Sequence, residues 1–255
     1  MPLRNLRIAA EKVRDEGAKR LKVEFEAEGA TSLDARQIAS IATEGGLGLV
    51  IKIGGCEAVR DIRESLELGA DSIVAPMIES PFAAAKFTSA VKLEATLSGT
   101  PLPQLAINIE SATGISALPT ILKDRAIDQI ERIVLGRTDL IASLGLAPKE
   151  VDGEIVAAHA RRTLRAAREA GLLTTLGGTV TSNSIRFIDS LDGLVDNFET
   201  RKVVFSKRDV SSLPRAIDSG LRFELAWLEF KTQELGEQTT KESRRKQILA
   251  ERLAL

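Results

Sequence analysis

The chain alternates short β-branched runs with segments of helical periodicity, and this alternation most strongly limits how it can fold. Each run ends in polar or glycine residues, and the runs occupy residues 21–28, 47–55, 71–80, 105–111, 132–139, 172–181 and 193–206. Strands this apolar, when helices separate them, are typical of parallel sheets that are covered on both faces. The sequence therefore predicts an α/β fold with seven or eight parallel strands.

The chain length selects a closed barrel among the α/β folds. It has 255 residues, close to the ~250 residues of a (β/α)8 barrel. No strand run is followed by the G-x-G-x-x-G fingerprint that would favour a doubly wound dinucleotide-binding sheet. We expect a (β/α)8 TIM-type barrel, although residues 194–205 leave little room for a helix in the eighth unit.

Both ends of the chain depart from the alternating pattern. The first 20 residues read as helix, and after residue 212 the pattern is helical throughout. We therefore divide the chain into a barrel domain at residues 1–212 and a C-terminal helical extension at residues 213–255.

Charge and cysteine content exclude several function classes. The chain carries 35 Lys and Arg against 36 Asp and Glu, a net charge of -1, which disfavours nucleic-acid and membrane-surface binding. The basic run KESRRK at residues 241–246 is interpreted as a solvated helix face. Cys56 is the single cysteine, and no apolar stretch reaches the ~20 residues of a membrane span. We expect a cytoplasmic location.

In a (β/α)8 barrel the active site forms at the carboxyl ends of the strands, so polar residues there are the candidates. They are Glu24, Glu26, Glu28, Lys52, Glu79, Asn108, Glu110, Arg137, Asp139, Asn183, Asn197, Glu199 and Arg201. Glu110 and Asp139 end successive strands about 4.8 Å apart, so their carboxylates can converge. A hard divalent ion such as Mg²⁺ would remove their repulsion; alternatively, each acid caps the helix that follows it.

Three stretches of this sequence resemble a known superfamily. GADSIVAPMIES, INIESATGISALPTIL and IVLGRTDLIASLG, in this order and spacing, are similar to the HpcH/HpaI-type 2-oxo-acid aldolases and the citrate lyase β-subunits. RKVVFSKRDV, followed by the helix around Trp227, resembles the G-K-W-x-I-H-P-x-Q-I segment of the citrate-lyase-like branch. In that segment the histidine and proline are Ser206 and Lys207 here. The resemblance spans roughly residues 20 to 230.

The resemblance implies a modified (β/α)8 barrel that acts as a metal-dependent carbon–carbon lyase or aldolase. Its substrate would be a 2-oxo acid or an acyl-CoA-type thioester, cleaved or formed through a metal-stabilised enolate. The family pattern places Mg²⁺ or Mn²⁺ on Glu110 and Asp139. Backbone amides around Thr138 would hold the substrate carboxylate, and Asn108 is a further candidate substrate contact.

The sequence also departs from the family pattern. Lys52 stands where the family has a substrate-binding arginine, and a lysine does not reproduce that two-pronged geometry. The family histidine of an early D-x-E-H motif is absent, because the matching stretch runs from Glu24 to Ala27. Glu28 is the nearest group left to move a proton. Arg137 is a candidate for bidentate binding of a substrate carboxylate or phosphate, or for a salt bridge to a neighbouring acid.

Two other functions remain open at this stage. Lys52 could form a Schiff base if burial near another cation, such as Arg137, freed its amine. The loss of the family histidine and arginine would also suit a non-catalytic barrel subunit of a larger assembly.

The C-terminal segment indicates an oligomer. Ile248, Leu249 and Leu253 form an apolar stripe beyond a polar stretch, from which we expect a homo-oligomer, a trimer or hexamer.

Overall fold

Eight strands form a closed barrel in chain order in the computed structural model, which describes residues 2–234, 236 and 239–253. The strands are β1 (Ala18–Glu24), β2 (Gly48–Lys52), β3 (Ser72–Ala75), β4 (Gln104–Ile109), β5 (Arg132–Gly136), β6 (Leu173–Gly177), β7 (Asn197–Glu199) and β8 (Val203–Ser206). The predicted barrel and every predicted strand run are therefore confirmed. The first strand ends earlier than predicted, at Glu24, because residues 25–28 form the short helix α2 (Phe25–Glu28).

The expectation that all strands are parallel was wrong at the last strand. The pairs from β1 to β7 are parallel, but β8 is antiparallel to both β7 and β1. The three residues between β7 and β8, from Thr200 to Lys202, can close a hairpin but cannot hold the helix that a parallel crossover requires. A hairpin thus completes the barrel in place of the eighth βα unit.

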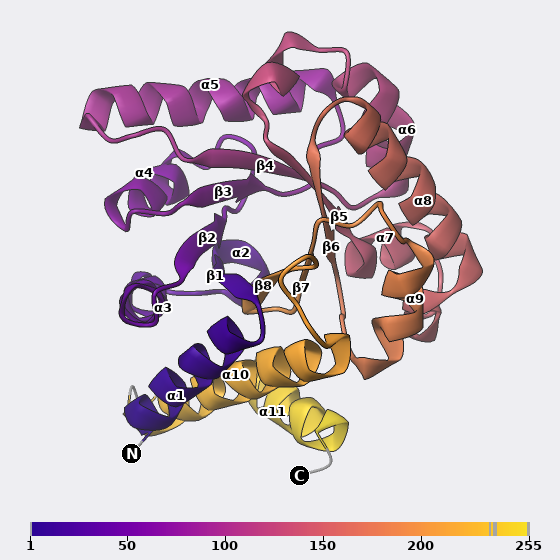
Figure 1. Ribbon diagram of the computed structural model, residues 1–255. Helices are drawn as coiled ribbons and strands as arrows, with labels where there is room; N and C mark the ends of the chain where they lie inside the picture. Colours follow the sequence, from indigo (N-terminus) through magenta and orange to yellow (C-terminus); the bar gives the residue numbers. More distant parts are fainter. Residues whose placement is uncertain (1, 235, 237–238, 254–255) are drawn as a thin grey trace.

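Helices cover the outside of the barrel (Figure 1). They are α1 (Pro2–Asp15), α3 (Ser32–Glu44), α4 (Val59–Glu67), α5 (Pro81–Ser98), α6 (Ala112–Ile121), α7 (Arg137–Ser143), α8 (Glu154–Glu169), α9 (Ile185–Ser190), α10 (Leu213–Glu234) and α11 (Thr240–Arg252). Three 3₁₀ turns, η1 (Arg125–Gln129), η2 (Pro148–Asp152) and η3 (Ser182–Ser184), complete the connections.

Capping side chains fix where two of these helices begin. Thr31 caps α3 in a capping box with Asp34, and Gly45 follows the last turn. Ser80, not Glu79, caps α5 by accepting a hydrogen bond from the amide of Ala83.

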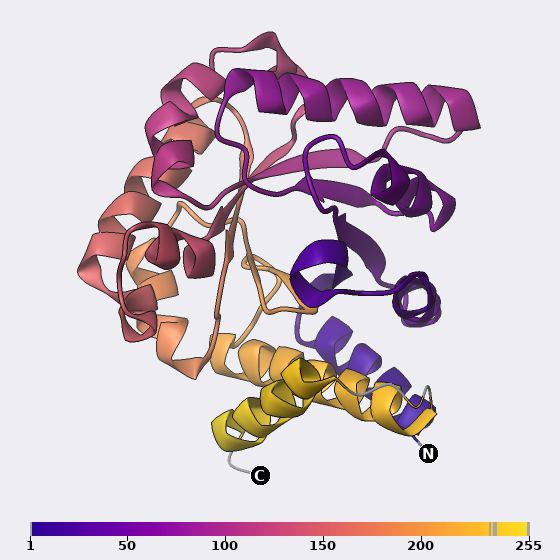
Figure 2. The same cartoon turned by 180° about the vertical axis from the view of Figure 1, so that it is seen from behind.

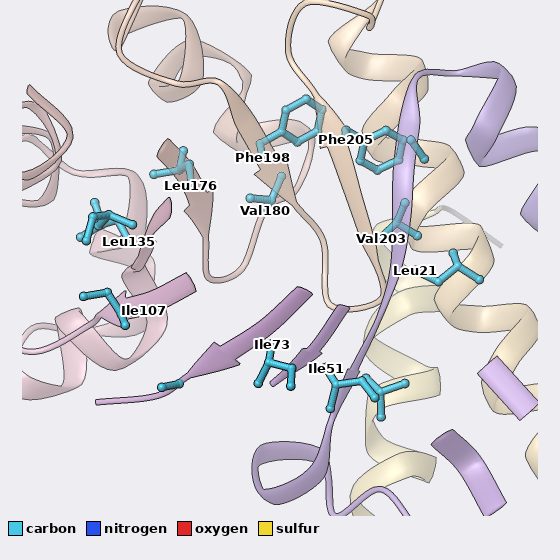
Figure 3. Packing of buried hydrophobic residues seen from close by; sticks show 14 of the residues in the cluster. Leu21, Ile51, Ile73, Ile107, Leu135, Leu176, Val180, Phe198, Val203 and Phe205 are labelled. Atoms are coloured by element: carbon cyan, nitrogen blue, oxygen red, sulfur yellow. The ribbon is translucent and has the colours of Figure 1, made fainter. Parts of the chain in front are cut away.

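Strand alternation divides the core into two parts. Side chains on the outer face of the strands pack against the helices, among them Leu21, Ile51 and Ile73 (Figure 3). The inner face carries a small separate cluster of Val50, Val74, Ala106, Val134 and Val204. The apolar filling of the barrel interior is therefore thin, and the positions beyond it along the same face are polar.

The two end segments pack together on one side of the barrel. Helices α1 and α10 lie side by side, and α11 crosses α10 on the side that faces the viewer in Figure 2, the same side as α2 (Figures 1 and 2). In α11 Leu249 is fully buried and Leu253 is nearly so. The chain itself therefore covers two of the three residues of the tail stripe, and Ile248 is half-buried, so the stripe does not require a neighbouring subunit. Leu235, which the sequence places on the α10 stripe, lies outside the described residues.

The division into a barrel domain at residues 1–212 and a C-terminal helical extension at residues 213–255 stays a prediction. Within the described residues, no helix combines the length and apolarity that crossing a membrane would require.

We predict that Phe223→Ala lowers the free energy of unfolding by about 3–5 kcal/mol, because Phe223 of α10 is 0% exposed and its removal leaves a cavity. Phe82→Ala is the matched control: Phe82 is 74% exposed on α5, so the change should stay within about 0.5 kcal/mol. Urea unfolding followed by circular dichroism measures both. Equal losses in the two variants would show that α10 does not belong to the cooperative core.

Candidate active site

A polar cavity of about 260 Å³ opens at the carboxyl ends of the strands. Its volume lies near the lower end of small-molecule sites, about 300–1,000 Å³. It is lined by Lys22, Glu24, Ala27, Lys52, Asn108, Glu110, Gly136, Thr138, Asp139, Gly178, Thr179, Val180, Glu199, Thr200, Arg201, Leu221, Lys241 and Arg245. Five predicted site residues, Lys52, Asn108, Glu110, Thr138 and Asp139, therefore come together here.

Glu110 lies directly after β4 and is held on both carboxylate oxygens. Its Oε1 accepts a hydrogen bond from the amide of Met77 at 3.1 Å. Its Oε2 accepts one from Asn108 Nδ2 at 2.7 Å and pairs with Lys52 Nζ at 3.2 Å. Three strand ends, β2, β3 and β4, thus converge on one buried carboxylate. Asn108 orients Glu110 in this arrangement.

Asp139, in the first turn of α7, lies next to Glu110. Burial and then the Glu110 carboxylate raise the pKa of Asp139, with Lys52 opposing them. The Glu110 side chain can lie this close to the start of α7 only because residue 136 is a glycine. An added Cβ at Gly136 would lie 2.5 Å from Glu110 Oε2. The carboxylates of Glu110 and Asp139 therefore lie together, as the strand order predicted, and their negative charges repel each other.

This pair fits a hard divalent cation by its donor chemistry. Mg²⁺ characteristically takes one or two carboxylates and fills its other positions with water and substrate oxygens. No cluster of three or more His, Cys, Asp or Glu residues suited to a metal occurs in residues 2–234, 236 and 239–253. A metal here would therefore take side-chain oxygens from Glu110 and Asp139, and the open cavity leaves space for its remaining ligands.

A second charge cluster fills the opposite wall of the barrel interior. Lys22 Nζ lies between Glu24, at 2.8 Å from Oε1, and Glu199, which it hydrogen-bonds. Burial opposes the charged form of Lys22, but the two carboxylates outweigh it and raise the pKa of Lys22. Although burial has the contrary effect, Lys22 and then Lys52 lower the pKa of Glu24 to about 2. This cluster ties β1 to β7.

Arg137 does not reach the cavity, so its predicted contact with substrate was wrong. The side chain is 0% exposed and forms an ion pair with Asp152. It donates to the carbonyl oxygens of Gly177 at 3.1 Å and Gly178 at 2.8 Å. Its guanidinium also stacks 4.7 Å from the ring centre of Phe187. Arg137 thus anchors the Gly177–Gly178 backbone behind the cavity wall, and the salt-bridge alternative describes its role.

Glu28 also lies outside this cavity. It lines a smaller adjoining hollow beneath α11, where it pairs with Lys202, and Lys202 in turn lies 5.6 Å from the ring centre of Trp227. Burial raises the pKa of Glu28 against the effect of Lys202. The expected upward shift is present, but the group does not line the cavity of Glu110 and Asp139. Its direct proton transfer there has no geometric support.

Three charged cavity residues, Lys22, Lys241 and Arg245, were not expected from the sequence. Lys22 lies in β1, two residues before Glu24. Because successive side chains of a strand point to opposite faces, Lys22 and Glu24 share one face, and the sequence could have placed both on the inner face. Lys241 and Arg245 belong to the basic run that we interpreted as a solvated helix face, yet both line the cavity. No local signal distinguishes them, because their position depends on where α11 packs.

The chain is similar to known proteins in both sequence and structure. The family model described as HpcH/HpaI aldolase/citrate lyase matches residues 36–186. No curated protein sequence matches the chain. The fold is similar to an HpcH/HpaI aldolase/citrate lyase family protein from Burkholderia cenocepacia J2315, at 19% identity and a TM-score of 0.59, covering 72% of this chain and 80% of that one.

Two further solved structures show the same fold. An HpcH/HpaI aldolase from Desulfitobacterium hafniense DCB-2 has 16% identity and a TM-score of 0.59, covering 74% of this chain and 78% of that one. Macrophomate synthase has 14% identity and a TM-score of 0.59, covering 78% of this chain and 74% of that one. At these identities the likeness establishes the fold alone.

We predict that Arg137→Met lowers the free energy of unfolding by about 3–5 kcal/mol, because it leaves Asp152 and two glycine carbonyls without their cation. Arg60→Met on the exposed surface of α4 is the control, with an expected change within about 0.5 kcal/mol. Chemical denaturation measures both variants. An Arg137→Met protein as stable as the wild type would contradict the anchoring role.

We predict that Glu24→Gln removes stability that is present above pH 4.5 and is lost as the pH falls toward 2. The sign follows because the pKa of Glu24 is about 2 in the folded chain against an ordinary 4.5, so protonation favours unfolding in that window. At neutral pH the difference should be on the order of 3 kcal/mol. Unfolding free energies across pH 2–7 test this, with exposed Glu26→Gln as control. A wild-type advantage that persists unchanged at pH 2 would contradict it.

Proposed function

We propose, since the chain belongs to the HpcH/HpaI aldolase/citrate lyase family, that it makes or breaks a carbon–carbon bond next to a 2-oxo acid with the help of a divalent metal. The family match supports a carbon–carbon lyase or aldolase. The observation that carries the metal is the pair of converging carboxylates, Glu110 and Asp139, in the cavity at the strand ends. Mg²⁺ or Mn²⁺ would be held by these two residues.

The chain's own groups suit a small carboxylic acid substrate. We assign its carboxylate to the backbone amides of Thr138 and Asp139, which belong to the first turn of α7 and have no acceptor within the helix. A metal on Glu110 and Asp139 would supply positive charge that stabilises an enolate. Lys52, already beside Glu110 at 3.2 Å, adds an ammonium that can donate one hydrogen bond to a substrate oxygen. The cavity volume favours a free small acid, and a thioester substrate stays an alternative.

The other candidate functions have weaker support. A Schiff base needs the neutral amine of Lys52, whereas Lys52 forms an ion pair with Glu110. The neighbouring cation invoked for it, Arg137, pairs with Asp152 and does not line the cavity. A non-catalytic subunit is favoured only by the missing family histidine and arginine, and no contact among the described residues adds to it. A homo-oligomer and a cytoplasmic location stay predictions, the second resting on the free Cys56.

We predict that Glu110→Gln and Asp139→Asn each weaken Mg²⁺ binding at least tenfold while the fold is kept, because each removes one of two anionic ligands. Calorimetric titration measures the affinity, and Glu67→Gln on the exposed end of α4 is the control. Proton exchange at the methyl group of pyruvate in D₂O should require the metal and stop with EDTA. Unchanged affinity in both variants would refute the site.

The same preparation distinguishes the Schiff-base mechanism. Borohydride with pyruvate should leave the mass of Lys52 unchanged. A borohydride-dependent mass gain at Lys52, with exchange that survives EDTA, would replace the metal-dependent mechanism by the covalent one.

A further inference from the structure

We propose that Lys241, from the C-terminal helix α11, is the residue that moves the proton in this cavity. This inference rests on the proposed function, because it identifies the proton-transfer group of that same site. It starts from the titratable side chains that line the cavity and from the partners that each of them has in the described part of the chain.

The other two lysines of the cavity are committed to carboxylates. Lys22 is buried between Glu24 and Glu199. Lys52 pairs with Glu110. Neither amine can exchange a proton with substrate without leaving its carboxylate partners unpaired in a buried setting, which is costly.

The carboxylates of the cavity are committed as well. Glu24 and Glu199 hold Lys22, while Glu110 and Asp139 form the converging pair assigned to the metal. The cavity has two arginines. Arg245 forms two hydrogen bonds to the Glu224 carboxylate, from Nε at 2.6 Å and from Nη2 at 2.7 Å. Arg201 faces two carboxylates, Glu28 at 3.9 Å and Glu224 at 3.8 Å. Neither arginine can therefore serve as the acid and base.

Lys241 differs from all of these. Among the described residues it has no ion-pair partner, and its Nζ donates a hydrogen bond to the backbone carbonyl of Ala27 at 2.6 Å. This hydrogen bond holds Lys241 Nζ at the rim of the cavity. The remaining hydrogen-bonding positions of the nitrogen are left for the substrate. Ala27 itself lines the cavity, so the amine lies at the wall formed by α2.

The helix that carries Lys241 is fixed over the barrel mouth. Thr239 caps α11 in a capping box with Glu242, and Lys231 of α10 pairs with Glu242 at 2.8 Å. The Arg245 pair with Glu224 and the buried Leu249 hold the following turns. Lys241 is exposed, but the helix that carries it is fixed at these points. Helix α11 lies beyond the family match at residues 36–186, so this group is a feature of the chain outside the matched region.

One lysine can carry both proton transfers of an aldol cleavage. Lys241 Nζ takes the proton of the substrate hydroxyl as the carbon–carbon bond breaks, which releases a carbonyl compound and leaves an enolate. The same nitrogen then returns that proton to the enolate carbon, which gives the 2-oxo acid and restores Lys241 to its starting form. No proton or electron is left over, and condensation is the same sequence in reverse.

The test separates binding from chemistry with Lys241→Ala and Lys241→Arg. With Mg²⁺ present, methyl-proton exchange of pyruvate in D₂O should fall at least about 100-fold in both variants, the range of general acid–base catalysis. Pyruvate binding, measured by calorimetry, should stay within about twofold in Lys241→Arg, since arginine keeps a long side chain with N–H donors at that place. Lys246→Ala, the same residue type on the same helix but outside the cavity lining, is the control and should exchange at the wild-type rate.

The possible outcomes are distinct. Wild-type exchange rates in Lys241→Arg would assign Lys241 an electrostatic role and overturn the proposal, as would near-normal exchange in Lys241→Ala. If Lys246→Ala lost exchange as strongly, the effect would come from α11 packing and the proposal would also fail. If the wild-type protein bound Mg²⁺ and pyruvate but exchanged no protons, the proposed function itself would fail, whatever the variants did.

Discussion

The need to pair charges inside a closed barrel determines most of this structure. Strand alternation sends every second side chain inward, and only a thin layer of five apolar residues fills that interior. The positions beyond this layer are charged, and a buried charge without a partner is expensive. Lys22 between Glu24 and Glu199, and Lys52 beside Glu110, satisfy this requirement across strands that are distant in sequence. The interior ion pairs therefore fix where the strand ends stand relative to one another.

The same pairing leaves a defined set of groups for chemistry. Most cations and anions of the described cavity residues neutralise each other, and the exceptions are Asp139, which faces Glu110 although Lys52 already pairs with that glutamate, and Lys241. The first is an excess of negative charge that suits a metal ion, and the second is an amine held only by a backbone carbonyl. Gly136 and the buried Arg137 support this arrangement from behind, the first by admitting Glu110 and the second by anchoring the neighbouring glycine backbone.

Prediction from the sequence succeeded where local pattern carries the information. The strand runs and the convergence of Glu110 with Asp139 follow from periodicity and strand order. It failed for Arg137, which has the position of a strand-end ligand but turns behind the wall to Asp152. It failed for the tail in the same way, because a basic amphipathic segment reads alike whether it faces solvent or a cavity of its own barrel.

The sequence by itself determined the barrel, its helical layer and the acids at the strand ends, because spacings of two and 3.6 residues decide which face each side chain takes. Only the tertiary structure decided the antiparallel closure by β8, the burial of Leu249 against the same chain, and the arrival of Lys241 at the mouth. Lys241 and Lys22 are 219 positions apart in the chain and line one cavity. Contacts of that kind depend on how whole elements pack, and no short stretch of sequence contains that information.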